Sequence, residues 1–270
     1  MVARSLVSRI IGTGLLCAAF SIPVSATTFF VPTWQYPNLQ AAYNACNNGD
    51  VISITSNQST AGFQISKSIT IQNGTLFPAV SIFLSSGFTI AANNITFTNL
   101  TIYGKNSSTA RCIQVNAGVQ GFYMTGCTVS RASGGSTGYG VYDLGSYNST
   151  FSDATFSGTN VGLLATNMNN FAMHYITRRS SFNNPYRNIR TVRNSGDVSW
   201  WIESIDFYAG SSNNATCFSA WNNNSSHIPW YWIEACNFRA YGTGSKCTTS
   251  ETNASMNAIN LQGCSLVHCN

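Results

Sequence analysis

Two glutamates stand at matching places in two similar stretches of the sequence. Glu203 belongs to the stretch WIESIDFYAG, and Glu234 belongs to the stretch WIEACNFRAY. Two carboxyl groups that flank a sugar bond are the usual catalytic pair of glycoside hydrolases, one acting as an acid while the other stays ionised. Each stretch also begins with a tryptophan, Trp201 or Trp232, whose ring could stack on a sugar. The two stretches therefore suggest carbohydrate chemistry, provided that the fold brings them together.

These stretches belong to a longer series of units with the pattern apolar-x-x-apolar-x-apolar. The units are Phe97-Leu100-Ile102, Met124-Cys127-Val129, Phe151-Ala154-Phe156, Met173-Ile176-Arg178, Ile202-Ile205-Phe207, Ile233-Cys236-Phe238 and Leu261-Cys264-Leu266. Segments rich in Gly, Ser and Asn separate them. Short strands repeated in this way, without ordinary helices between them, are typical of a solenoid. We expect a single-stranded right-handed parallel β-helix, with a slip of the alignment or a bulge where Arg178 occupies an apolar slot.

The segment before the repeats predicts a short helix that covers one end of the solenoid. Leu39, Ala42, Tyr43 and Cys46 have the spacing of one helix face, and Asn38 is suited to the N-cap position. A solenoid exposes its core at each end, so an amphipathic helix is a suitable cap.

The same segment carries a family resemblance. LQAAYNACNNGDVISI, followed by ISKSITIQNG, resembles the first part of the pectin-lyase-like β-helix superfamily, in which a capping helix precedes the first coil. The resemblance covers most of residues 34–270 and implies the fold, with carbohydrate chemistry as an expectation. The adjacent Asp pair of polygalacturonase-like members and the Arg-x-x-Pro-Arg run of pectate-lyase-like members are both absent. Catalytic residues must therefore be sought elsewhere in the chain.

Stacked coils convert sequence positions into columns on the surface. Equivalent residues of successive coils lie about 4.8 Å apart, and side chains that alternate with the core slots point outward. The outward columns of the first three coils hold mostly Thr and Ser. In the later coils they bring aromatic and charged residues into one strip: His174, Arg179, Trp201, Glu203, Asp206, Tyr208, Trp232, Glu234 and Arg239. We expect this strip to be a groove that binds a polysaccharide.

The residue types suggest roles within the strip. The candidate catalytic residues are Glu203, Glu234, Asp206 and His174, and the candidate substrate-binding residues are Trp201, Trp232, Arg179, Tyr208 and Arg239. A hydrolase would use the glutamates, with His174 tuning them or relaying a proton. A lyase would use Arg179, Tyr208 or His174 beside a sugar carboxylate. No cofactor is expected, although the three carboxylates could ligate Ca²⁺.

The alternative is that the strip is a salt-bridged surface with a purely structural role. Glu203 would then pair with Arg239 or Arg179, and the tryptophans would simply cover the sheet. A further alternative is a non-enzymatic cell-surface, adhesive or structural β-solenoid. That protein could associate end to end, since no cap is evident after the last repeat.

The remaining features limit the class of protein. Arg4 and Arg9 precede an apolar run too short to span a bilayer, which indicates a secretory signal over residues 1–26 and a single β-helix domain over residues 27–270. We therefore expect a secreted or extracellular protein, in the periplasm or at the cell surface, without a transmembrane segment. Removing the two arginines lowers the formal net charge from +5 to +3, which gives no indication of nucleic-acid binding.

Cysteine content adds a redox expectation. Eight cysteines follow the signal segment, and an even number in an exported chain favours disulfides. Cys236 and Cys264 share a core column on successive coils, so they form either a disulfide or a stacked pair of thiols.

Overall fold

The structure is a computed structural model of the 270-residue chain. It describes residues 25–74, 80–131, 137–166, 172–177, 180–184, 187–193, 198–209, 215–222, 230–240, 243, 245–252 and 258–267. Most of the expected signal segment lies outside these residues. Within them, no helix is long and apolar enough to cross a membrane.

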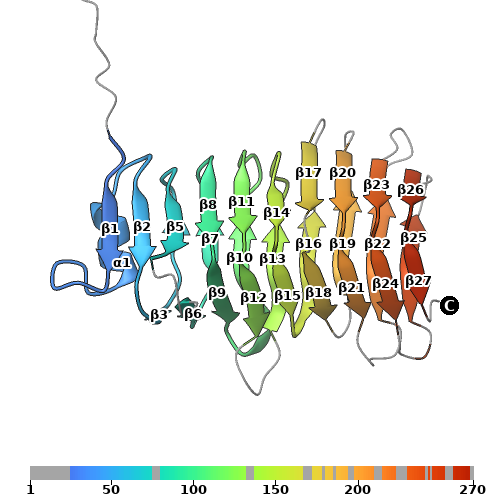
Figure 1. Cartoon of the computed structure of the whole chain (residues 1–270), viewed down its shortest axis with the longest axis horizontal. Coiled ribbons are helices and arrows are strands. Elements are labelled where there is room, and N and C mark those ends of the chain that lie inside the picture. Colours follow the sequence, from blue (N-terminus) through green and yellow to red (C-terminus); the bar gives the residue numbers. More distant parts are fainter. Residues whose placement is uncertain are drawn as a thin grey trace, which may run out of the picture.

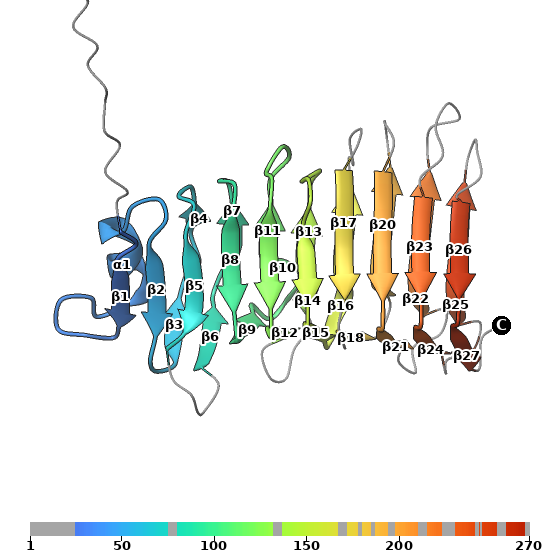
Figure 2. The same ribbon diagram turned by 45° about the horizontal axis from the view of Figure 1, so that its top comes forward.

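The described chain folds into a parallel β-solenoid with three sheets (Figures 1 and 2), which confirms the expected fold class. Sheet A contains β1 (Thr28–Val31), β2 (Val51–Ile54), β5 (Thr70–Asn73), β8 (Ile95–Thr98), β11 (Phe122–Thr125), β14 (Thr150–Ser152), β17 (Ala172–Thr177), β20 (Val198–Glu203), β23 (Trp230–Glu234) and β26 (Ala258–Gln262). Sheet B contains β3 (Gln58–Thr60), β6 (Val80–Leu84), β9 (Leu100–Gly104), β12 (Thr128–Arg131), β15 (Thr155–Ser157), β18 (Ser181–Asn184), β21 (Asp206–Ala209), β24 (Asn237–Ala240) and β27 (Ser265–Val267). Sheet C contains β4 (Gln64–Ile65), β7 (Phe88–Ile90), β10 (Ser107–Val115), β13 (Thr137–Asp143), β16 (Thr159–Thr166), β19 (Arg187–Arg193), β22 (Thr216–Asn222) and β25 (Lys246–Thr252).

A tight bend carries the chain from sheet A into sheet B. The bend residues share a left-handed backbone conformation, with φ between 50° and 63°: Asn99, Gly126, Asp153, Ser204, Ala235 and Gly263. The backbone N–H of Ser204 donates to the carbonyl of Glu234 at 3.0 Å, and the other bends continue the ladder in the same way. Each bend therefore stacks on the next, which keeps successive coils in register.

The predicted apolar slots form the core inside the three sheets. The pattern residues of the units that begin at Phe97, Met124, Phe151, Ile202 and Ile233 are all buried. On the inner face of sheet B, four phenylalanine rings stack in sequence, Phe156, Phe182, Phe207 and Phe238, with centroids 4.7 to 5.4 Å apart. Stacking of such rings adds to the stabilisation that burial of their surface provides.

The helix α1 (Leu39–Ala45) lies beside β1 at the N-terminal end of the solenoid (Figure 1). The Asn38 side chain caps it by accepting a hydrogen bond from the backbone N–H of Ala41 at 2.9 Å. Leu39, Ala42 and Tyr43 are buried, as their spacing predicts. The Lys67 ammonium donates to three carbonyl oxygens at the other end of α1, where a cation is favoured by the helix dipole.

The expected alignment of the repeat units with one another is wrong at the unit that begins at Met173. Ile176, and not Met173, pairs with both Phe151 and Ile202. Phe182 occupies the core slot that the alignment gave to Arg178. The cause is a longer bend, because three residues separate Thr177 from Ser181 where only two separate their partners in the preceding coil, Ser152 and Thr155. The suspected slip at Arg178, which itself lies outside the described residues, is therefore confirmed.

Candidate functional site

Three exposed tryptophans cover the outer surface of sheet A on β20 and β23. Trp201 pairs in register with Trp232, and their rings stack with centroids 5.5 Å apart and planes 7° apart. Trp201 is 37% exposed, Trp232 is 39% exposed and Trp230 is 63% exposed. The expected stacking of Trp201 on Trp232 is thus present, and Trp230 enlarges the aromatic surface.

A cleft of about 230 Å³ opens among these tryptophans. Its lining also includes Ser199 and, on the neighbouring strand β26, Asn260. Ser199 is the direct partner of Trp230 on the adjacent strand. The four outward positions of β20 and β23 that line the cleft therefore hold three large rings and one small side chain, and the small serine accounts for the hollow. A mostly apolar cleft with polar groups at its edge is suited to the face of a sugar ring.

Glu203 and Glu234 stand beside this cleft. They pair directly in register, each two residues after its tryptophan. The indole Nε1–H of Trp201 donates to Glu203 at 3.3 Å, and that of Trp232 donates to Glu234 at 3.4 Å. Both carboxylates are half-buried. They therefore orient the indoles and remain available at the edge of the cleft.

Asp206, Tyr208 and Arg239 lie on sheet B, beyond the bend that follows Glu203 and Glu234. Tyr208 pairs in register with Arg239, and Asp206 accepts a hydrogen bond from the Asn237 amide at 2.9 Å. The expected single strip is thus divided between two sheets. The two glutamates and Asp206 do not form a group of ligands that could hold a metal ion.

The alternative of a salt-bridged surface requires Glu203 to pair with Arg239 or Arg179, and only the first pairing involves described residues alone. Among these residues, no ion pair joins Glu203 or Glu234 to Arg239. The other pairing and the proposed role in substrate binding both involve Arg179, which lies outside the described residues. Asn183 occupies the place that the alignment gave to Arg179, between Ser157 and Tyr208.

His174 lies inside the solenoid and not on its outer strip. It pairs with the inward-facing Trp200, and the two rings stack with centroids 4.5 Å apart. Its side chain is fully buried, and neither ring nitrogen has a hydrogen-bond partner among the described residues. Burial lowers the pKa of His174 to about 4, with a small opposing effect from the Asp143 carboxylate. The expected outward placement of His174 is wrong, because Ile176 and not Met173 occupies the core slot of β17. A shift of three residues along a strand turns every side chain to the opposite face.

Trp230 and Ser199 were missed by the sequence reasoning. The alternation in WYWIE puts Trp230 on the same face as Trp232, so a longer outward column would have included it. Ser199 carries no signal of its own, and its contribution is visible only once its partner is known to be Trp230.

The cysteines differ from the redox expectation. Among the described cysteines, Cys247 is disulfide-bonded, and six others have free thiols: Cys46, Cys112, Cys127, Cys217, Cys236 and Cys264. The Cys236 thiol donates to the carbonyl of Glu234 at 3.1 Å, and burial raises its pKa to about 12. Of the two alternatives for Cys236 and Cys264, the structure therefore contains the thiols.

Comparison with known proteins adds no relative. The chain matches no model of a known protein family, and a search of curated proteins finds none with significant similarity.

Proposed function

We propose that the chain is an exported β-helix protein, related to the pectin-lyase-like superfamily, that binds a polysaccharide in the tryptophan cleft. The observation that carries the proposal is the cleft itself, with three exposed indoles around about 230 Å³. Aromatic faces beside hydrogen-bonding carboxylates suit sugar rings, which have an apolar face and a polar rim. The resemblance to the superfamily, carried by residues 39–54 and 65–74, and the segment at residues 1–26 with the features of a secretory signal are consistent with this function.

Binding is tested by titrating neutral and acidic oligosaccharides into the full chain and following tryptophan fluorescence and heat. Trp232→Ala should weaken binding by at least ~10-fold, because an anchoring aromatic ring commonly contributes about 2 kcal/mol. Tyr123→Ala is the matched control, since Tyr123 occupies the same outward column on β11 and is similarly exposed. Equal affinity in both variants, or no binding of any oligosaccharide, would contradict the proposal.

Cleavage of the bound glycan is a second candidate function. One observation favours it, which is the direct pairing of Glu203 with Glu234 on neighbouring strands. Such strands lie about 4.8 Å apart, and retaining glycosidases place their two carboxyl groups roughly 5 Å apart. Glu203→Gln should then abolish turnover and leave oligosaccharide binding intact. Assays of reducing ends and of unsaturated ends, with Ca²⁺ or EDTA, separate hydrolysis from a calcium-assisted lyase reaction, and unchanged turnover in the variant would exclude this role for Glu203.

The structural or adhesive alternative has support at the last described coil. Leu261 and Leu266 continue the core columns of Ile233 and Phe238, yet they are 39% and 52% exposed. Exposed apolar side chains of this kind are suited to packing against another molecule. Sedimentation over a range of concentrations tests this, because end-to-end association predicts larger species at high concentration, whereas a strict monomer counts against it.

A further inference from the structure

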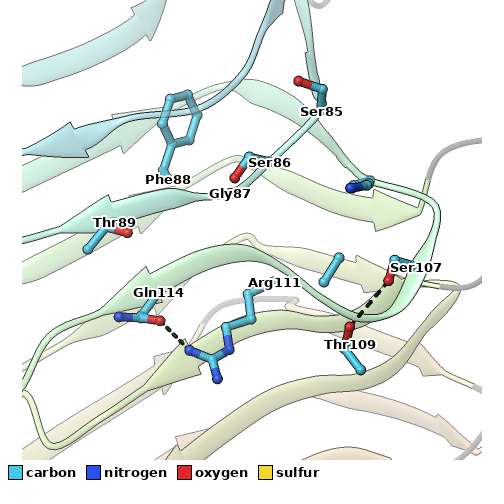
Figure 3. A pocket seen from close by; sticks show the side chains of 11 residues that line it. Ser85, Ser86, Gly87, Phe88, Thr89, Ser107, Thr109, Arg111 and Gln114 are labelled. Atoms are coloured by element: carbon cyan, nitrogen blue, oxygen red, sulfur yellow. Dashed lines mark hydrogen bonds between the residues drawn. The ribbon is translucent and has the colours of Figure 1, made fainter.

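A second hollow, of about 320 Å³, lies at sheet C, between β7, β10 and the chain that leads into them (Figure 3). Its lining combines two cations, Lys105 and Arg111, with five hydroxyl side chains. These hydroxyls belong to Ser85, Ser86, Thr89, Ser107 and Thr109. Among the described residues, no Asp or Glu lines it. The hollow is therefore positively charged and rich in hydrogen-bond donors, unlike the cleft on sheet A.

The backbone of this hollow has two unusual features. Between the paired positions at Ser107 and Arg111, β10 contains two more residues than its neighbour β13, so the strand bulges there. On the preceding coil, a Cβ atom at Gly87 would lie 2.1 Å from the carbonyl oxygen of Arg111. Only glycine permits this approach, which fixes the backbone of Arg111 against the coil that carries Ser85 and Ser86.

The Arg111 side chain is held in place by two neighbours. Its guanidinium lies over the ring of Tyr142, with 4.0 Å from Cζ to the ring centroid. It also donates a hydrogen bond to the side-chain oxygen of Gln114, as Figure 3 shows. A guanidinium has five N–H donors, and among the described residues Gln114 is its one side-chain acceptor. Arg111 is thus oriented without being neutralised by a carboxylate.

We propose that this hollow binds a tetrahedral oxyanion, a sulfate or phosphate group, either as the free ion or as an ester on a saccharide. A planar guanidinium fork matches such a group, and an ammonium adds a second positive charge. Hydroxyl groups come from two coils, Ser85 and Ser86 from one and Ser107 and Thr109 from the next. Donors on several sides suit three or four oxygens better than the two of a carboxylate. The proposal does not depend on the tryptophan cleft.

Isothermal titration of the full chain at fixed ionic strength tests the proposal. The ligands are sodium sulfate, glucose 6-sulfate, glucose 6-phosphate, glucuronate and glucose. We expect saturable binding of at least one sulfate or phosphate ligand, and binding of glucuronate at least ~10-fold weaker. Equal affinity for inorganic sulfate and the ester identifies a site for the free ion, whereas binding of the esters alone identifies a substituted saccharide. Absence of binding by all tetrahedral oxyanions, or equally tight binding of glucuronate, overturns the assignment.

Variants locate the binding in this hollow. Arg111→Gln should weaken the affinity by ~10-fold or more, because a charge-assisted hydrogen bond is lost. Gln114→Glu keeps the side-chain size, pairs with Arg111 and repels the anion, so it should abolish binding. The Gln114 amide also donates to the side-chain oxygen of Asn116 at 3.0 Å, so in the variant the Asn116 amide must turn to donate instead, and a thermal melt verifies that the fold is kept. Lys246→Gln is the matched control, since Lys246 is an exposed cation on β25 of the same sheet. Wild-type affinity in both Arg111→Gln and Gln114→Glu would refute the site.

Discussion

The outer surface of sheet A presents two different sets of side chains on the same backbone arrangement. On β8 and β11 one outward column holds Thr98 and Thr125, and on β20 and β23 the corresponding position before the bend holds Glu203 and Glu234. The inward residues and the bends keep the same register in both regions. The difference shows that the inward residues and the bends determine the solenoid, while the outward residues are free to take on a binding role.

The interior changes between the same two regions. The inward column two residues before the core slot holds Ile95 and Phe122 in the earlier coils, and His174, Trp200 and Tyr231 in the later ones. The Tyr231 hydroxyl is satisfied by Thr191 at 2.7 Å, whereas in the described part of the chain the side-chain nitrogens of His174 and Trp200 have no hydrogen-bond partner. A buried polar group without a partner costs roughly 1–3 kcal/mol. In the later coils these unpaired nitrogens therefore offset part of the stabilisation that burial of the rings provides.

The largest expected change in the free energy of unfolding tests whether the inward residues contribute most of the stability of the solenoid. Phe207→Ala removes a fully buried ring from the ladder on sheet B, and it should lower the free energy of unfolding by roughly 3–5 kcal/mol. Thr98→Ala, on the outer surface of sheet A, should change it by less than about 0.5 kcal/mol. Chemical denaturation of both variants measures the contrast, and similar losses would show that outward residues also determine the fold.

The next largest effect is a pH dependence of the free energy of unfolding, which arises from His174 in the later coils. The pKa of His174 is about 4 in the folded chain and near 6.5 when unfolded. Between these values the unfolded state binds more protons, so the free energy of unfolding falls as the pH falls from about 6.5 to 4. His174 alone should account for a loss of about 3 kcal/mol between pH 7 and pH 4.

His174→Phe isolates this contribution, because phenylalanine can still stack on Trp200 but has no titrating group. Denaturation of both proteins at pH 7 and pH 4 gives the difference between their losses. A variant that loses as much stability as the wild type would show that the buried imidazole is not responsible.

A smaller expected effect, on the affinity for a glycan, tests the tryptophan cleft. Ser199→Phe places a ring where the serine leaves space, so glycan binding should weaken by about 2 kcal/mol, roughly 30-fold. Thr150→Phe makes a similar change on the outer face of β14, outside the cleft, and should leave the affinity unchanged. Titration of the same oligosaccharide into both variants provides the measurement, and unaltered affinity in Ser199→Phe would show that the hollow does not receive the sugar.

The regular parts of the molecule were predictable because each coil repeats the same physical requirement. Apolar residues at fixed spacing must be buried, so the core slots around Phe97 and Ile233 and the face of α1 could be derived from sequence. A bend longer by one residue gives no such signal, and it separates Ile176 from Phe182 by one residue more than the repeat allows. The repeat was therefore matched to Met173, three residues too early, which put His174 on the outer strip when it lies in the interior. The hollow around Arg111 was also missed, because a strand bulge that occurs in one coil leaves no repeat to detect.

The smallest expected change in the free energy of unfolding comes from substitutions at the bends between sheet A and sheet B. Gly126 and Ala235 occupy the same left-handed bend position, with φ of 63° and 51°. That conformation costs a residue with a Cβ roughly 1–2 kcal/mol, whereas glycine loses about 0.5–1 kcal/mol through its greater freedom when unfolded. Ala235→Gly should therefore raise the free energy of unfolding by about 0.5–1 kcal/mol, and Gly126→Ala should lower it. A gain in Ala235→Gly, measured by chemical denaturation, would confirm that the left-handed conformation limits the later bend as it does the earlier one. The loss in Gly126→Ala has a second cause, since a Cβ atom there would lie 2.1 Å from the side-chain oxygen of Asn99. A loss in both variants would mean that neighbouring contacts outweigh the backbone conformation.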